Sequence, residues 1–113
     1  GRQTRYSYHG AISDTETQMF DGILKYDLLD GSHKRHRFDP NVCGSEPAFA
    51  PRFDAKSEDD GYVMSFVTDI STRESRALII DAKNIEGRPL AEVCLPQCVP
   101  LGFHGTWANL DEF

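Results

Sequence analysis

The sequence predicts an all-β fold of antiparallel strands. Its apolar residues alternate with polar ones or form short runs that end at turn residues, which is the period-2 pattern of strands. Glycine, proline and Asp-Gly pairs punctuate the chain at the spacing of strands rather than of helices. A length of 113 residues fits one compact unit with a single core.

The N-terminal half is expected to begin with a strand over Arg5–Ala11. A hairpin follows, with Phe20–Leu29 as its first arm, Asp30-Gly31 as its turn and His33–Phe38 as its return. Ser45–Phe53 contains two prolines, which cannot donate hydrogen bonds to a ladder. We therefore expect this extended segment at a sheet edge or in a partial ladder.

Three β-rich segments, Tyr62–Ile70, Ser75–Asp81 and Leu90–Leu95, are joined by short polar connections and predict an antiparallel meander. The acidic segment Ser57–Gly61 before them is expected to be a turn without a further role. Asp81–Gly87 is long enough for one helical turn. Together with a preceding strand, the meander matches a four-stranded blade of a β-propeller, whereas a sandwich or a small barrel is the competing arrangement.

Composition argues against several functions. Acidic residues outnumber basic ones by 18 to 12, a net charge of -6, so no nucleic-acid or anionic-membrane surface is expected. No apolar run approaches the roughly 18 to 20 residues of a membrane-spanning helix. Cys43, Cys94 and Cys98 favour reduced thiols and a cytoplasmic protein, with peripheral membrane attachment as an alternative. Since the chain starts at Gly1 without an initiator Met, we expect the natural N-terminus further upstream.

Three of the four histidines carry no functional signal. His33 and His36 stand among lysines and arginines that oppose metal binding, and both are expected on a solvated strand surface. His9 is expected on the opposite face of its strand from Tyr6 and Tyr8, as an ordinary polar residue.

His104 stands between two nearby glycines in an aromatic segment that ends at Trp107. Small neighbours let another backbone or a bound ion approach the imidazole. Two alternatives follow: a metal ligand or catalytic base, and a histidine packed in an aromatic core. A structural zinc site is poorly supported, because the Cys94-x-x-x-Cys98 pair and His104 lack a fourth ligand.

Glu46 is a lone acid that leads into an apolar run, and an acid that enters a core must be paired or hydrogen-bonded. One such arrangement is a carboxylate that accepts the second ring N–H of a ligating histidine, because that bond fixes the tautomer. A turn acid in water is the alternative. Nearby, Cys43 is expected as a small apolar residue at a strand edge. No Ser/His/Asp arrangement, Gly-rich phosphate loop or HExxH helix supports a hydrolase, a nucleotide-binding protein or a zinc protease.

Four segments occur in a distinctive order, and they are Gly44–Arg52, Glu58–Ser65, Leu78–Ala82 and Val99–Trp107. In this order they resemble the C-terminal end of the carotenoid cleavage oxygenase family. That family includes carotenoid and apocarotenoid dioxygenases, lignostilbene dioxygenases and the isomerase of the retinal pigment epithelium. Each segment alone is unspecific, so the order carries the resemblance.

The resemblance implies the C-terminal part of a seven-bladed β-propeller, about one complete blade plus parts of its neighbours. The family propeller holds one Fe(II) ion through four histidines, which suit Fe(II) and leave positions open for O2. His104, in its Gly-Phe-His-Gly segment, is thereby implied as an iron ligand. Glu46, in its Ser-Glu-Pro segment, is implied as a carboxylate that orients a ligating imidazole.

The implied reaction cleaves a conjugated C=C bond of an apolar carotenoid, apocarotenoid or stilbene with O2 and yields two carbonyl products. Phe103 and Trp107 are expected to line the apolar surroundings of the metal. Family members are several times longer, and their other three iron ligands lie upstream of this chain. We therefore expect the 113-residue chain alone to be inactive and its open strand edges to favour self-association. The alternative is a noncatalytic β-module that binds a partner, with His104 packed in its core.

Overall fold

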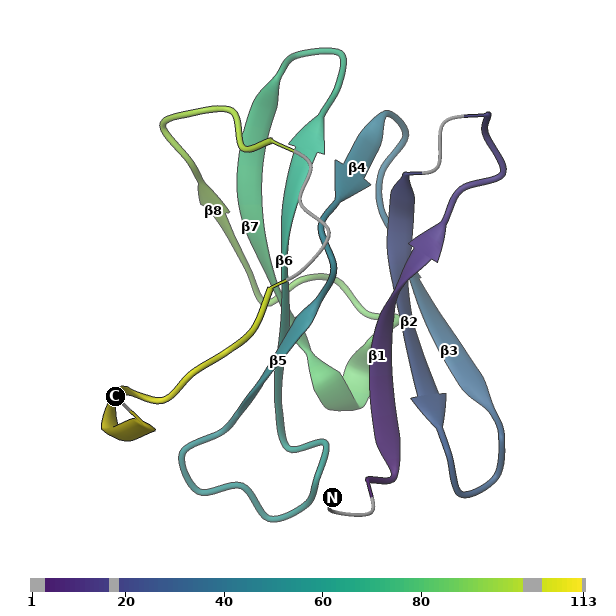
Figure 1. The fold of residues 1–113 in the computed structure, drawn as a ribbon, viewed down its shortest axis with the longest axis vertical. Helices are drawn as coiled ribbons and strands as arrows, with labels where there is room; N and C mark the ends of the chain where they lie inside the picture. The colour runs from purple at the N-terminus through teal and green to yellow at the C-terminus, as the bar shows by residue number, and fades with distance from the viewer. Residues whose placement is uncertain (1–3, 17–18, 101–104, 113) are drawn as a thin grey trace.

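The computed structural model describes residues 4–16, 19–100 and 105–112, and these form strands with two short 3-10 turns (Figure 1). The strands are β1 (Tyr6–Ile12), β2 (Phe20–Asp27), β3 (His33–Arg37), β4 (Val42–Gly44), β5 (Ala48–Pro51), β6 (Gly61–Asp69), β7 (Glu74–Asp81) and β8 (Ala91–Cys94). The turns are η1 (Ala82–Asn84) and η2 (Leu110–Glu112). The strand pairs are antiparallel, which confirms the predicted all-β class. Within these described residues, no helix is long and apolar enough to cross a bilayer.

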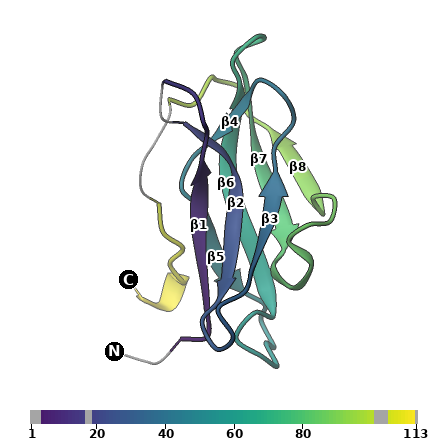
Figure 2. The same cartoon turned by 90° about the vertical axis from the view of Figure 1, so that its right-hand side faces the viewer.

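The strands form two layers joined by one short connection. In the first layer, β2 pairs with β1 on one side and with β3 on the other. In the second, β6, β7 and β8 pair in chain order, and the free side of β6 pairs with β4 and β5. A single bridge between Phe20 and Gly44 links the layers into one continuous ladder. Figure 2 shows β1 to β3 in front of β6 to β8.

The core lies between the two layers. Ile23 of β2 packs in one cluster with Val63 of β6 and Ile80 of β7, and all three side chains are 0% exposed. Ala82 and Ile85, in and after η1, close the end of this cluster. Burial of each large aliphatic side chain is worth about 1.5 to 3 kcal/mol. The two layers are therefore held together mainly by this apolar contact.

The predicted hairpin and meander are confirmed, and one strand was missed. Gly31 has a φ of 75°, the left-handed conformation that an Asp-Gly turn supplies without strain. The missed strand is β4, whose three residues are too few to show an alternating pattern. Cys43 is buried, as expected of a small apolar residue, but the expected edge position is wrong, because β4 lies between β2 and β6.

The expectation that His36 is solvated is also wrong, whereas His33 is exposed as predicted. His36 lies opposite Ile23 in the ladder, and its Nδ1 is 2.8 Å from the carbonyl oxygen of Ile85. Because a carbonyl only accepts, Nδ1 must carry the proton. The arginines on either side of His36 suggested an exposed side chain. This inference failed because adjacent residues of a strand point to opposite faces of the sheet.

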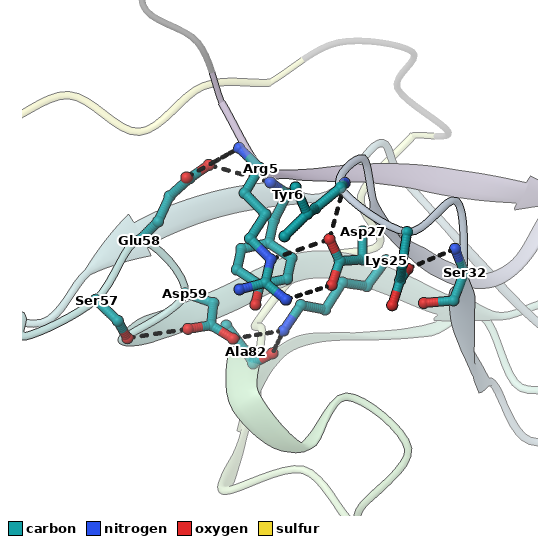
Figure 3. A network of polar contacts seen from close by, with 11 residues as sticks. Arg5, Tyr6, Lys25, Asp27, Ser32, Ser57, Glu58, Asp59 and Ala82 are labelled. Carbon is teal, nitrogen blue, oxygen red and sulfur yellow. Dashed lines mark hydrogen bonds and ion pairs between the residues drawn. The ribbon is translucent and has the colours of Figure 1, made fainter.

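The acidic turn Ser57–Gly61 ties the second layer to the first (Figure 3). The carboxylate of Glu58 accepts hydrogen bonds from the backbone amides of Arg5 and Tyr6 at 2.9 and 3.1 Å. The carboxylate of Asp59 pairs with the buried Lys25 ammonium group at 2.8 Å. The turn was expected to have no further role, but it fixes the start of β1 and satisfies a buried cation.

Candidate functional site

The chain around Glu46 leaves the regular ladder in a β-bulge. Gly44 pairs with Val67 and Ala48 pairs with Met64, so the three residues 45–47 lie opposite only two residues of β6. The strands β4 and β5 are thus one strand interrupted by an extra residue. Bulges of this kind redirect a side chain and are frequent next to active sites.

Hydrogen bonds from Ser45 fix this bulge to β6. The Ser45 amide donates to the carbonyl oxygen of Phe66 at 2.8 Å, and the Ser45 hydroxyl accepts from the Phe66 amide at 3.1 Å. The Ser65 hydroxyl donates to the Ser45 carbonyl at 3.0 Å. The buried Pro47 has no amide hydrogen to leave unpaired. The Ser-Glu-Pro sequence therefore suits a bulge whose middle residue is Glu46.

Glu46 is half-buried and lines a cavity of about 430 Å³. One wall comes from the face of β5, β6 and β7, where Ala48, Met64 and Ala77 lie. Other lining residues, including Trp107, come from the C-terminal segment. Among the described residues that line this mostly apolar cavity, Glu46 is the one carboxylate. Glu46 is thus only partly in contact with water, and its role as the carboxylate partner of a histidine stays a prediction.

His104 and Phe103 lie outside the described residues, so the structure does not test the ligand prediction. Gly105, the residue after His104, lines the same cavity as Glu46. Trp107 is 46% exposed, and its indole Nε1 donates to the Asn109 side chain at 3.2 Å. The described residues that directly follow His104, Gly105 to Trp107, therefore line the cavity of Glu46.

The other three histidines, His9, His33 and His36, lie in the first layer, away from the cavity of Glu46. His9 and His33 both contact the ring of Tyr26, with centroid distances of 5.7 and 5.6 Å, and both are exposed. His36 is held by the Ile85 carbonyl. In residues 4–16, 19–100 and 105–112 no group of three or more His, Cys, Asp or Glu side chains is arranged to hold a metal ion. The side chains of the described residues therefore do not form an iron site by themselves.

Sequence reasoning missed two buried polar features. Lys25 is 8% exposed and donates to the carbonyl oxygen of Ala82 at 2.7 Å as well as to Asp59. Thr68 and Ser75 are a buried cross-strand pair whose hydroxyl oxygens are 2.7 Å apart. Strand alternation places Lys25 on the same face as Ile23, and this signal could have identified it as buried.

A known protein family matches almost the whole chain. Residues 1–109 match the family model described as retinal pigment epithelial membrane protein. The chain belongs to this family, the carotenoid cleavage oxygenases. The matched range includes the bulge, the cavity and the segment that contains His104.

Curated relatives of the chain are carotenoid-cleaving enzymes. The chain is 38% identical over 112 residues to the 9-cis-epoxycarotenoid dioxygenase NCED6 of Arabidopsis thaliana, covering 99% of the chain and 18% of that enzyme. It is 41% identical over 120 residues to the zeaxanthin 7,8(7',8')-cleavage dioxygenase of Crocus sativus, covering 99% of the chain and 32% of that enzyme. The chain therefore spans a third or less of the length of these relatives.

Solved structures agree with the sequence matches. A variant of the Synechocystis apocarotenoid oxygenase superposes with a TM-score of 0.85 at 34% identity, covering 96% of the chain and 23% of that structure. A cobalt-substituted form of the same oxygenase gives a TM-score of 0.79 at 32% identity, covering 90% and 22%. These neighbours are β-propeller enzymes, so the two layers of the chain correspond to part of a propeller.

Proposed function

We propose that the chain is the C-terminal part of an Fe(II)-dependent dioxygenase that cleaves a conjugated C=C bond into two carbonyl products. The family match over residues 1–109 carries this proposal. One alkene and one O2 give two carbonyls, so atoms and electrons balance without a further reductant. Bound Fe(II) would supply the site at which O2 is activated.

Within that enzyme, the chain would contribute His104 as one iron ligand and Glu46 as a positioning residue. A carboxylate on the second ring N–H of a ligating imidazole holds its orientation and increases its basicity. The bulge supports this role, because it takes Glu46 out of the ladder and into a cavity that Gly105 also lines. The existence of a cobalt-substituted form of the Synechocystis oxygenase is consistent with a metal site in that relative.

We propose a carotenoid or apocarotenoid as the substrate, because the relatives are named for these compounds. A stilbene remains the third class that the sequence allows. Incubation of the full-length protein with O2 and one member of each class, followed by identification of the carbonyl products, separates the three. Cleavage of none of them would count against the enzyme and favour a noncatalytic β-module.

The ligand role is tested by His104→Ala in the full-length protein. We expect loss of bound iron and of cleavage, because an imidazole is removed from a four-ligand site. His33→Ala is the matched control, since His33 is an exposed strand histidine. Normal iron content and activity in His104→Ala would refute the ligand role and favour the alternative of a packed histidine.

The positioning role is tested by Glu46→Gln, with the exposed Glu74→Gln as control. Loss of such an outer partner typically costs 10- to 100-fold in metal affinity or activity. We expect a decrease of about that size for Glu46→Gln, with an unchanged unfolding midpoint. Unchanged iron affinity and turnover would refute the assignment.

We propose that the 113-residue chain alone is inactive and self-associates. The side chains of Phe66 and Val93 are 51% and 48% exposed on the second layer, and β8 pairs only with β7 along the described chain. An exposed apolar face beside an open strand edge favours pairing with another chain. Light scattering over a concentration series tests this, and a monomer at high concentration would contradict it. A cytoplasmic location remains a prediction from the cysteines.

A further inference from the structure

Two hydrogen bonds tie Val99 to the turn end of the β6–β7 hairpin, and a third joins the two side chains that make them. The Val99 amide donates to the Ser75 hydroxyl at 2.8 Å, and the Thr68 hydroxyl donates to the Val99 carbonyl at 3.2 Å. The two hydroxyl oxygens are 2.7 Å apart. Since the Thr68 proton is directed to Val99, the Ser75 hydroxyl must donate to Thr68.

The result is a closed ring that engages both the amide and the carbonyl of one residue. Each hydroxyl accepts one hydrogen bond and donates one, so the three bonds run in one direction and polarise one another. Ser75 is 2% exposed and Thr68 is 8% exposed, so water competes little for these groups. We call this arrangement the Thr68–Ser75 clamp.

The clamp acts on a stretch of chain that is already stiff. The amide of Leu95 donates to the carbonyl of Ser75 at 2.9 Å and extends the β7–β8 ladder by one bond. Pro96 then follows Leu95, and Pro100 follows Val99. A proline restricts both its own φ and the conformation of the residue before it. Residues 95–100 are therefore fixed at two points on one serine, and the chain passes from the sheet edge onto the sheet face (Figure 1).

The chain that leaves the clamp leads to the segment that contains His104. Val99 and Pro100 line the cavity of Glu46 on one side of that segment, and Gly105 lines it on the other. Thr68 and Ser75 lie on the same sheet face as Phe66 and Ala77, which also line this cavity. The clamp thus anchors the incoming end of the segment to the same rigid sheet that carries the bulge.

We propose that Thr68 and Ser75 are positioning residues for the metal site, because they hold the chain at Val99, just before the segment that contains His104. This proposal rests on the iron-ligand role proposed for His104. A metal site requires its ligands within about 0.5 Å of the productive geometry, which a freely moving loop does not provide. An anchor on a buried strand pair restricts the positions open to one end of the segment that carries the ligand.

The test uses the full-length protein with three variants at threonines. Thr68→Val keeps the side-chain shape and removes the hydroxyl that donates to Val99 and accepts from Ser75, whereas Thr68→Ser keeps the hydroxyl. Thr72→Val is the control, because Thr72 lies exposed in the turn of the same hairpin. The measurements are the dissociation constant of Co(II), the visible absorption spectrum of the Co(II)-loaded protein and hydrogen exchange at the Val99 amide. The unfolding midpoint of each variant is measured in parallel.

We expect Thr68→Val to weaken Co(II) binding by about two- to tenfold, the size of effect expected when the one hydrogen bond to Val99 is lost. It should also change the Co(II) spectrum and accelerate exchange at Val99, while Thr68→Ser and Thr72→Val resemble the wild type. Wild-type Co(II) affinity and spectrum in Thr68→Val would overturn the positioning role. His104→Ala distinguishes the two proposals: if it loses Co(II) while Thr68→Val does not, only the clamp proposal fails. If His104→Ala keeps Co(II), both fail.

Discussion

The ion pair between Lys25 and Asp59 is expected to stabilise the packing of the two layers. The Lys25 ammonium group lies 2.8 Å from Asp59 Oδ2, 2.7 Å from the Ala82 carbonyl and 4.3 Å from the centroid of the Tyr6 ring. The side chains of Lys25 and Asp59 are only 10% and 14% exposed. Asp59→Asn removes the negative charge. The nearly buried Lys25 ammonium group then keeps only the Ala82 carbonyl and the face of the Tyr6 ring as partners.

Removal of one partner from a fully buried pair costs about 3 to 5 kcal/mol. Because Lys25 keeps two other partners and some solvent contact, we expect Asp59→Asn to lower the free energy of unfolding by about 2 kcal/mol. Urea unfolding at neutral pH measures this value, with the exposed Asp54→Asn as control. A loss of less than about 0.5 kcal/mol, as for ordinary surface substitutions, would refute the reasoning.

The pH dependence of the same pair gives an independent check. Burial raises the pKa of Asp59, but hydrogen bonds from Lys25 and Ser57 outweigh it, and the net pKa is lowered from 3.8. A carboxyl whose pKa is lower in the folded state stabilises the protein above its unfolded pKa, and this contribution is lost as the pH falls. The stability difference between wild type and Asp59→Asn should therefore shrink below about pH 4. A constant difference down to pH 2 would contradict this assignment.

Three further predictions concern the core and the thiols. Tyr8→Phe should leave the stability unchanged or increase it, because the buried Tyr8 hydroxyl has no hydrogen-bond partner among the described residues; a large loss in thermal unfolding would contradict this. Gly22→Ala should lower the free energy of unfolding by about 1 to 3 kcal/mol or more, since a Cβ there would lie 2.3 Å from the backbone oxygen of His36. A near-normal urea midpoint would contradict this and show that β2 and β3 can move apart at little cost. A thiol reagent should modify the two exposed cysteines first and Cys43 only slowly, because burial limits access and raises the pKa of that thiol; equal rates would refute its burial.

Most strands could be predicted because their pattern is local. The segments that became β1, β2, β6 and β7 either alternate or form short apolar runs that end at turn residues, and the observed bounds differ from the predicted ones by only a few residues. Gly31 marked its turn because few other residues adopt a positive φ. The assignment of the second layer as a meander is likewise confirmed by the pairing of β6 with β7 and of β7 with β8.

The features that sequence reasoning missed depend on partners far away in the chain. His36 is buried because residue 85, which is distant in sequence, supplies a carbonyl to its ring. Lys25 is buried because the acidic turn brings a carboxylate to it. The Thr68–Ser75 clamp requires the chain near residue 99 to fold back onto the hairpin. No local sequence pattern predicts these long-range contacts. The residues of the candidate site could therefore be predicted from residue type and family resemblance, but the geometry of the site could not.

The bulge at Glu46 follows from two packing requirements on opposite sides of it. Gly44 pairs with Val67 on the core face of β6, and a Cβ at Gly44 would lie 2.5 Å from the Phe38 ring. Phe49 must reach the same core face, where its ring stacks on Tyr8 with centroids 5.4 Å apart.

Residues five apart in a regular strand point to opposite faces, so a regular strand could not satisfy both contacts. One extra residue restores the match, and the ladder then continues through β5 in the shifted register. The residue released from the ladder is the only acid between Gly44 and Phe49. Core packing on both sides therefore holds the Glu46 carboxylate at the cavity, and the site needs no separate scaffold to position it.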